Sequence, residues 1–286
     1  MNPLNDFFDT IDELRTYVPY ISGRFEFSEL NSSSIGARKQ IRDIITKSLW
    51  DTIKNETDTD AKMYLSNAFG NLTMYKAIIF SVVSSRASGG LDVYKSELET
   101  MRREYMDNYY SAMDSLIEEL TENANYASWK DTSNYKLLSS LQIKTTGEFN
   151  SFYGIDMSFL FFFRSIPLQR EILLDGLADL FAKTADRPEL QIKLKLALSQ
   201  LVVAMALSRF DIIELPATIR NMFDEQKALR SGKDEQSRIL LLADDLRAKA
   251  MDTISAVELS LSDPDTSNIV SQTSFNLPDD KIYLIP

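Results

Sequence analysis

The fold is decided by residues 188–207, which read PELQIKLKLALSQLVVAMAL. Apolar residues recur there at intervals of three and four, as on one face of a helix, and they also occupy much of the opposite face. A helix that is apolar almost all round lies at the centre of a protein. Its most apolar part, residues 194–207, is too short to span a bilayer and has charged neighbours. The stretch therefore predicts a buried core helix, and residues 186–189 (DRPE) have the spacing of a capping box at its start.

Helical periodicity extends from this core helix toward the N-terminus. An apolar stripe over residues 37–53 predicts one helix, and the polar residues 55–58 predict the N-cap of a second, which Gly89-Gly90 ends. A stripe over residues 94–120 steps by three and four, as in a coiled-coil seam, and predicts a third and longer helix.

On the other side, the pattern predicts further helices around the same core. Ser165 is expected to cap a helix whose first turn contains Pro167, because a proline at that position loses no hydrogen bond. Pro216 begins another helix, residues 231–233 interrupt it, and residues 239–261 form the last long stripe. The expected fold is all-α, a helical bundle or two, and 44% apolar residues are enough to bury a real core.

The chain divides into two helical halves, a connector and two extended arms. Periodicity is lost between residues 123 and 154, so loop and short extended pieces are expected there, with residues 142–146 a candidate strand. The expected boundaries are 1–30 for an N-terminal arm, 31–125 for the first half, 126–164 for the connector, 165–262 for the second half and 263–286 for a C-terminal arm.

An internal duplication is one interpretation of the two halves. A shift of 131 residues pairs Ile41 with Ile172 and Trp50 with Phe181, and it brings further apolar positions together without a gap. Any two amphipathic helix pairs with similar loops would match about as well, so both interpretations stay open.

The chain contains no histidine and no cysteine, whereas an average composition would supply about six histidines. This double absence excludes Ser-His and Cys-His catalysis, zinc sites built from these residues and di-iron sites of the Glu-x-x-His type. An all-carboxylate Mg or Ca site stays open, but no cofactor is implied. Without cysteine there is no sign of an oxidising compartment, and the first residues lack the basic and apolar regions of a secretion signal, so synthesis in the cytoplasm is expected.

The charge balance also excludes classes of partner. With 31 basic and 42 acidic residues the net charge is −11, which repels phosphate backbones and anionic membranes. Neither DNA nor a membrane is therefore an expected ligand.

Paired carboxylates are the main catalytic machinery that remains. Glu118-Glu119 and Asp244-Asp245 are adjacent on expected helices and point to different parts of the surface, so neither pair predicts a shared site. Residues 263–267 copy the start of a calcium loop but lack its glycine and its closing glutamate. The chain contains neither a P-loop nor a GxGxxG motif. No catalytic, cofactor-binding or metal-binding residue is predicted.

Two blocks carry a resemblance to a known family. Residues 141–155 (LQIKTTGEFNSFYGI) run into 158–164 (SFLFFFR), and a second block spans 195–200 (KLALSQ), 204–207 (AMAL) and 212–216. Together they resemble an uncharacterised family of proteins of similar length that phages and prophages of Bacteroidetes encode.

The resemblance implies a structural virion or morphogenesis protein with no assigned reaction. A helical core with extended ends is similar to the connector or adaptor rings between a phage portal and its tail. It implies a ring-like homo-oligomer with portal or tail partners, located in the virion, and DNA only as a molecule that passes through a lumen. A negative wall would not hold the phosphates of such a duplex. A tail-completion or minor capsid role is the close alternative.

The two arms are the expected interfaces. Extended segments with apolar residues commonly add to, or plug a groove on, a neighbouring subunit, although such a tail can also fold back onto its own domain. The residues expected to make these contacts are Phe275, Leu277, Ile282, Tyr283, Leu284 and Ile285 in the C-terminal arm, and Phe25 and Phe27 in the N-terminal arm.

Two aromatic groups are interpreted mainly as core. The cluster between Phe149 and Phe163 could anchor an interface but more often fills the junction of two halves. Tyr105, Tyr109 and Tyr110 could stack bases, but the neighbouring Glu104 and Asp107 favour a packed seam.

Two functions of other classes remain as alternatives. One is a soluble hydrolase that uses carboxylates alone, and the other is a cytoplasmic helical adaptor unrelated to phage.

Overall fold

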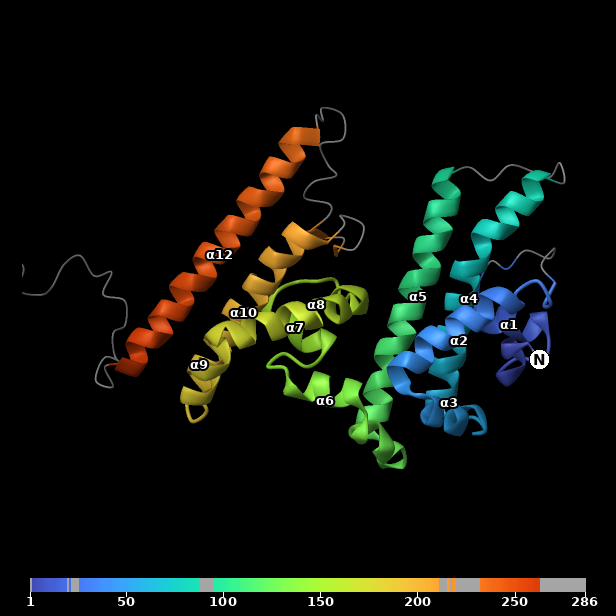
Figure 1. Ribbon diagram of the computed structural model, residues 1–286, viewed down its shortest axis with the longest axis horizontal. Helices are drawn as coiled ribbons and strands as arrows, with labels where there is room; N and C mark the ends of the chain where they lie inside the picture. Colours follow the sequence, from blue (N-terminus) through green and yellow to red (C-terminus); the bar gives the residue numbers. More distant parts are fainter. Residues whose placement is uncertain are drawn as a thin grey trace, which may run out of the picture.

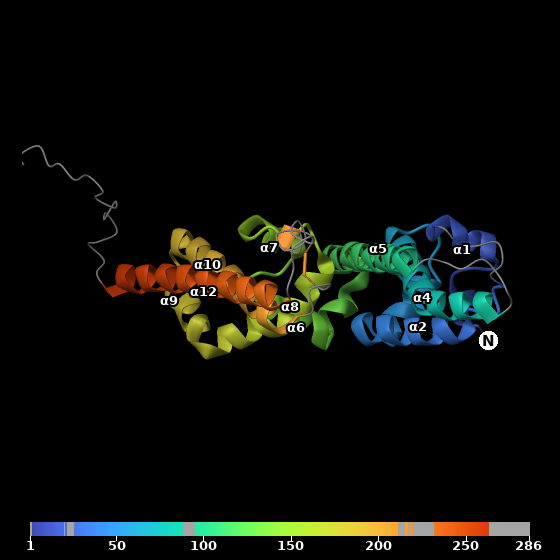
Figure 2. The same cartoon turned by 90° about the horizontal axis from the view of Figure 1, so that it is seen from above.

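The computed structural model describes residues 2–19, 21, 26–87, 95–210, 215–216, 218–219 and 232–262. Over these residues the protein is all-α and contains helices but no strand, which confirms the predicted fold class. The molecule is elongated, with the N-terminal half at one end of its long axis and the C-terminal half at the other (Figures 1 and 2).

The N-terminal half is built on a long helical hairpin of α4 (Asp60–Ala87) and α5 (Lys95–Glu122). The predicted α5 stripe is buried against α4 through residues such as Tyr105, Met113 and Leu116. Thr59 caps α4, because its Oγ1 accepts a hydrogen bond from the Lys62 amide at 3.3 Å, so the cap lies just after the polar residues that predicted it. The predicted stop at Gly89-Gly90 lies outside the described residues.

Two helices replace the single one predicted over residues 37–53. The helix α2 (Asn31–Ile45) begins earlier, and α3 (Lys47–Lys54) follows after a break at Thr46, whose φ is 78°. The apolar stripe gave no sign of this break, because Ile41, Ile45, Leu49 and Ile53 stay on one side of both helices and all are buried.

The N-terminal segment packs onto its own half of the molecule. It contains a short 3-10 helix η1 (Pro3–Asp6) and the helix α1 (Ile11–Tyr17), and Leu4, Phe8 and Leu14 are fully buried. The indole Nε1 of Trp50 donates to Asp6 Oδ2 at 3.2 Å. Over its described residues the predicted arm is therefore part of the core, because its apolar residues find their partners within the same chain.

The predicted connector is largely helical, so the expectation of loop and strand is wrong there. It contains the 3-10 helix η2 (Ala124–Asp131) and the helices α6 (Ser133–Ser140) and α7 (Thr146–Phe152), while residues 142–145 form bends. Thr145 caps α7 by accepting from the Glu148 amide at 3.1 Å, and Glu148 Oε2 accepts from the Lys144 amide at 2.8 Å. This local bonding satisfies the first amides of a helix instead of a strand ladder.

The helix predicted to start at Ser165 starts earlier. Ser158 caps α8 (Phe159–Ile172) by accepting from the Phe161 amide at 3.2 Å, and both Ser165 and Pro167 lie inside the helix. The buried phenylalanines at the start of α8 make it favourable to extend the helix over the aromatic run.

A π-helical turn, η3 (Leu173–Leu177), joins α8 to α9 (Ala178–Lys183), and Gly176 supplies the positive φ of 118° that this turn requires.

The C-terminal half repeats the hairpin design with α10 (Pro188–Arg209) and α12 (Gly232–Ser262). The helix α10 starts at the predicted place, but its N-cap Arg187 makes no side-chain capping bond, because its Nη1 donates to the Ser260 carbonyl at 3.2 Å instead, so the capping box is not formed. By length and composition α10 could cross a membrane, a test that a buried core helix also passes. Leu194, Leu198 and Val202 are fully buried, as predicted for a core helix.

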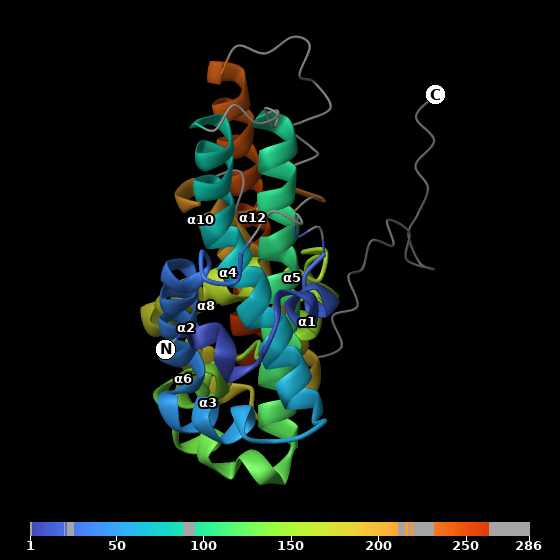
Figure 3. The ribbon, with the colours of Figure 1, turned by 90° about the vertical axis from the view of Figure 1, so that its right-hand side faces the viewer.

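The element order is the one that a duplication would leave. In each half a helix is followed by a short helix and then by a long hairpin, with α2, α3, α4 and α5 matching α8, α9, α10 and α12. The paired Trp50 and Phe181 are both buried in the corresponding short helices. The two hairpins run in similar directions (Figures 1 and 3). The duplication stays a prediction that this order supports.

Candidate functional site

Most of the predicted interface residues lie outside the described residues. This holds for Phe25 and for the six residues of the C-terminal arm: Phe275, Leu277, Ile282, Tyr283, Leu284 and Ile285. Phe27 is half-buried and packs against the core of its own chain, and its carbonyl oxygen accepts a hydrogen bond from Asn2 Nδ2 at 3.0 Å. Phe27 is thus engaged within the molecule.

Both aromatic groups are core, as expected. Phe149, Phe161 and Phe162 are buried, and the Phe149 and Phe161 rings meet edge to face with centroids 5.8 Å apart. Tyr105 and Tyr109 are buried in the hairpin seam. Tyr110 and Phe163 are half-buried, and the fully buried rings are not available for stacking bases.

The adjacent carboxylates do not form a joint site. Asp244 pairs with Arg247 at 2.9 Å and Asp245 pairs with Lys249 at 2.7 Å, so the two side chains of that pair have separate partners. Within the described residues no group of three or more carboxylates is arranged to hold a metal ion.

One carboxyl group has a shifted acidity at the junction between the halves. Asp114 on α5 accepts a hydrogen bond from Thr146 Oγ1 on α7 at 3.1 Å. Burial raises the pKa of Asp114 to about 6, with the Thr146 bond lowering it and Glu118 raising it further. The pKa of Asp114 therefore depends on how α7 packs on α5.

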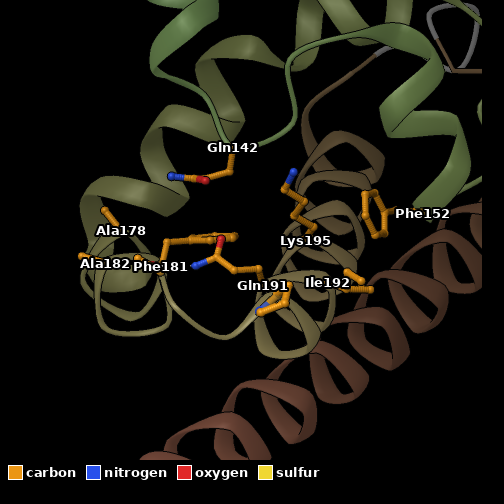
Figure 4. Close-up of a pocket in the computed structure, with 10 residues that line it drawn as sticks. Gln142, Phe152, Ala178, Phe181, Ala182, Gln191, Ile192 and Lys195 are labelled. Atoms are coloured by element: carbon orange, nitrogen blue, oxygen red, sulfur yellow. Dashed lines mark hydrogen bonds between the residues drawn. The ribbon is translucent and has the colours of Figure 1, made fainter.

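A hollow of about 620 Å³ lies between α7, α9 and α10. Figure 4 shows Phe152 and Phe181 on either side of Lys195 in this view, with Gln142 above and Gln191 below. Apolar and polar side chains therefore share its lining.

Two polar side chains of this hollow, Lys195 and Gln191, already have partners. Lys195 Nζ binds Glu148 Oε1 at 2.6 Å, and Gln191 Nε2 donates to the Phe181 carbonyl at 2.7 Å and to Thr184 Oγ1 at 2.8 Å. These bonds fasten α7 and α9 onto α10. The hollow thus serves the packing of the C-terminal half.

The outer face of α12 is apolar at several exposed positions. The helix packs on α10 through residues such as Ala243, Ala250 and Val257, which are fully buried. On the face turned away from α10, Leu241 is 68% exposed and Leu259 is 61% exposed. Leu240 and Met251 are also exposed, and we call these four leucine and methionine residues the α12 row. Leu241 and Leu259 are about five turns apart, and the exposed carboxylates of Asp244 and Asp245 lie between them, so the row consists of separate apolar positions along the helix.

A basic cleft lies where α2, α5, α6 and α8 meet. It consists of two adjoining hollows of about 570 and 380 Å³ that share Lys39 and Asp43. Its rim carries Lys39, Arg42, Lys47 and Arg38, the last paired with Asp6 at 3.5 Å. Among the described residues that line it, Asp43 is the one carboxylate. Such a concentration of cations is unusual in a chain with a net charge of −11.

The inner part of the basic cleft is aromatic. Tyr109, Tyr110 and Phe163 line it together with Gln40 and Asn134. The Tyr109 side chain is fully buried, yet its hydroxyl has no hydrogen-bond partner among the described residues and lies beside Gln40 without reaching bonding geometry. Burial raises the pKa of Tyr109, so the group stays a neutral donor. A buried hydroxyl without a partner costs about 1–3 kcal/mol, and because the Tyr109 side chain is fully buried this cost belongs to the packed interior.

The basic cleft was not found by sequence reasoning, because its residues come from four helices that are distant in the chain. One signal was present: residues 38–47 contain four basic residues and one acidic residue, against the acidic balance of the whole chain.

Comparison with known proteins adds no relative to this description. No protein-family model, no curated protein and no solved structure matches the chain.

Proposed function

We propose that this protein is a structural subunit that assembles with copies of itself. We further propose that it forms a head-to-tail connector ring of a tailed-phage particle, between portal and tail proteins. The particle assignment draws on the resemblance of residues 141–164 and 195–216 to phage-encoded proteins. The self-assembly draws on the surface of the protein.

The α12 row is the observation that carries this proposal. Large apolar side chains on one face of a long helix, flanked by polar residues, are typical of a protein contact surface. The helix lies at the outer edge of the molecule and packs mainly on α10 (Figure 1). A second copy of the chain is the occupant that a self-assembling subunit would bring to this face.

The chemistry of the sequence supports a role without catalysis. A chain without histidine and cysteine lacks the side chains that most often act as acids, bases and nucleophiles near neutral pH. Structural subunits need extended contact surfaces, and an elongated all-α molecule provides them.

Light scattering of the full chain across a concentration series tests the self-assembly. We expect the wild type to form oligomers, and the double variant Leu241→Glu with Met251→Glu to dissociate at least about tenfold more readily, because each change places a charge in an apolar contact. Ala256→Glu is a control for added charge, since it places one carboxylate at an exposed α12 position outside the row. A wild type that stays monomeric, or a row variant that assembles like the control, would remove the proposal.

The particle assignment needs its own test. Mass spectrometry of purified particles, from the phage or prophage whose genome encodes this chain, should detect it at a constant ratio to the portal protein. Its absence from the particles would remove the virion part and leave a helical adaptor.

A further inference from the structure

The basic cleft on α2 requires a particular kind of occupant. Its rim is cationic and its inner wall is aromatic. An occupant that fits must combine negative charge and apolar side chains within a short length. An extended peptide with acidic residues next to aromatic and aliphatic ones has this chemistry.

This chain contains such a segment outside the described residues. Residues 275–285 read FNLPDDKIYLI, in which Asp279-Asp280 is flanked by Phe275 and Leu277 on one side and by residues 282–285 on the other. Pro278 excludes a continuous helix over this stretch. The acidic pair matches the cationic rim, and the flanking aromatic and aliphatic residues match Tyr109, Tyr110 and Phe163.

The direction of the chain favours an occupant from another molecule. The segment follows Ser262, and α12 ends at the end of the long axis remote from α2 (Figures 1 and 2). A second copy placed head to tail would bring this segment to the basic cleft without a return along the length of its own molecule. Such a heterologous contact repeats from copy to copy and closes into a ring when the rotation permits.

We propose that the basic cleft binds residues 275–285 of a second copy, with Asp279-Asp280 against Lys39 and Arg42 and the apolar residues against the aromatic wall. This inference rests on the proposed self-assembly and names the second contact of that assembly, beside the α12 row. The six C-terminal residues predicted from sequence as interface contacts are then part of the ligand of the basic cleft, whereas Phe25 and Phe27 are not.

Charge reversal in the full chain tests the contact. Lys39→Glu with Arg42→Glu reverses the basic cleft, and Asp279→Lys with Asp280→Lys reverses the segment. We expect each reversed variant alone to self-associate at least about tenfold more weakly than the wild type, because like charges then face each other. Lys183→Glu with Lys193→Glu is the matched control, since it changes the net charge equally at exposed positions on α9 and α10.

Mixing separates a contact between copies from one within a copy. An equimolar mixture of the two reversed variants should recover association, because each wild-type segment then finds a wild-type cleft and each reversed segment a reversed one. If only the combined quadruple variant recovers, the segment binds its own cleft and the proposal is overturned. Reversed-cleft protein that associates like the control would also overturn it.

A peptide titration keeps this inference distinguishable from the proposed function. A fluorescent peptide of residues 271–286 should bind the wild-type full chain and bind the reversed-cleft variant at least about tenfold more weakly. A different result would remove this contact but leave the proposed function standing. In that result the α12 row variant loses self-association, cleft reversal leaves self-association unchanged, and the peptide does not bind. An oligonucleotide that binds the cleft in place of the peptide would also remove it.

Discussion

Thr46 separates α2 from α3 with φ 78° and ψ 160°, a backbone conformation that β-branched residues rarely adopt. We predict that Thr46→Gly raises the free energy of unfolding by about 1 kcal/mol, because glycine adopts this conformation without the steric strain. Urea denaturation measures the change.

Thr145→Gly is the control for this prediction. Thr145 has φ −130° and caps α7, so its replacement should lower the free energy of unfolding. If both variants lose stability to the same extent, Thr46 is not strained.

Asp114 makes stability depend on pH at the junction of the halves. Its pKa is raised from 3.8 to about 6 by burial, so between these values the folded state binds more protons than the unfolded state. The free energy of unfolding therefore falls as the pH rises from about 4 to about 6, and the loss persists above that range.

We predict that Asp114→Asn is more stable than the wild type above about pH 6 and that this difference disappears near pH 4. Asparagine keeps an acceptor oxygen for Thr146 without the charge. Denaturation of both proteins across this range measures the difference. Asp252→Asn, at an exposed position of α12, is the control for removal of a carboxyl group, and equal behaviour of the two variants would contradict the burial argument.

At the scale of elements, Gly70 determines how closely the N-terminal segment approaches α4. A Cβ at this position would lie 2.6 Å from Val18 Cγ2 and 3.0 Å from Leu14 Cδ1. The branched side chain of Val18 cannot turn away easily. We predict that Gly70→Ala lowers the free energy of unfolding by about 1–3 kcal/mol, because overpacking outweighs the gain in helix propensity.

Gly36→Ala on α2 is the matched control, because its Cβ would meet only Lys76 Cδ at 3.6 Å and Lys76 Cε at 3.9 Å. It should raise stability by up to about 1 kcal/mol, since alanine favours a helix. Denaturant midpoints compare the two, and a stabilising Gly70→Ala would mean that α1 is not tightly docked.

The long helices were predictable from the sequence because their stripes are long. Over residues 94–120 many apolar positions agree on one period, whereas α7 spans only Thr146–Phe152 and offers too few to define one. The sequence nonetheless indicates where α7 starts, because Thr145-x-x-Glu148 has the pattern of a capping box. The basic cleft could not be predicted from the sequence, because no local sequence pattern indicates which helices pack together.

At the scale of the whole molecule, the two halves are joined through few contacts. Asn134 Nδ2 donates to the Ile44 carbonyl at 2.6 Å, and the Phe159 ring lies 6.2 Å from that of Tyr110. Phe159 is buried at this junction. The coupling of the halves therefore depends on a small set of side chains.

We predict that Phe159→Ala costs about 3–5 kcal/mol and separates one thermal transition into two, because the cavity lies at the junction of two halves that are each built on a long hairpin. Calorimetry measures this as a calorimetric enthalpy larger than the van't Hoff enthalpy. Phe69→Ala, inside the N-terminal half, should lower the transition temperature without that separation. A single transition in Phe159→Ala would show that the halves fold as one unit.

The burial of the first residues against α4 has a consequence during synthesis. Phe7 leaves the ribosome before Phe69, whose ring it meets with centroids 5.9 Å apart. At roughly 5–20 residues per second, the apolar N-terminus stays uncovered for about 3–12 seconds until its partner emerges. Nascent chains on neighbouring ribosomes expose this apolar segment together, so this interval is the stage at which a chaperone would matter most.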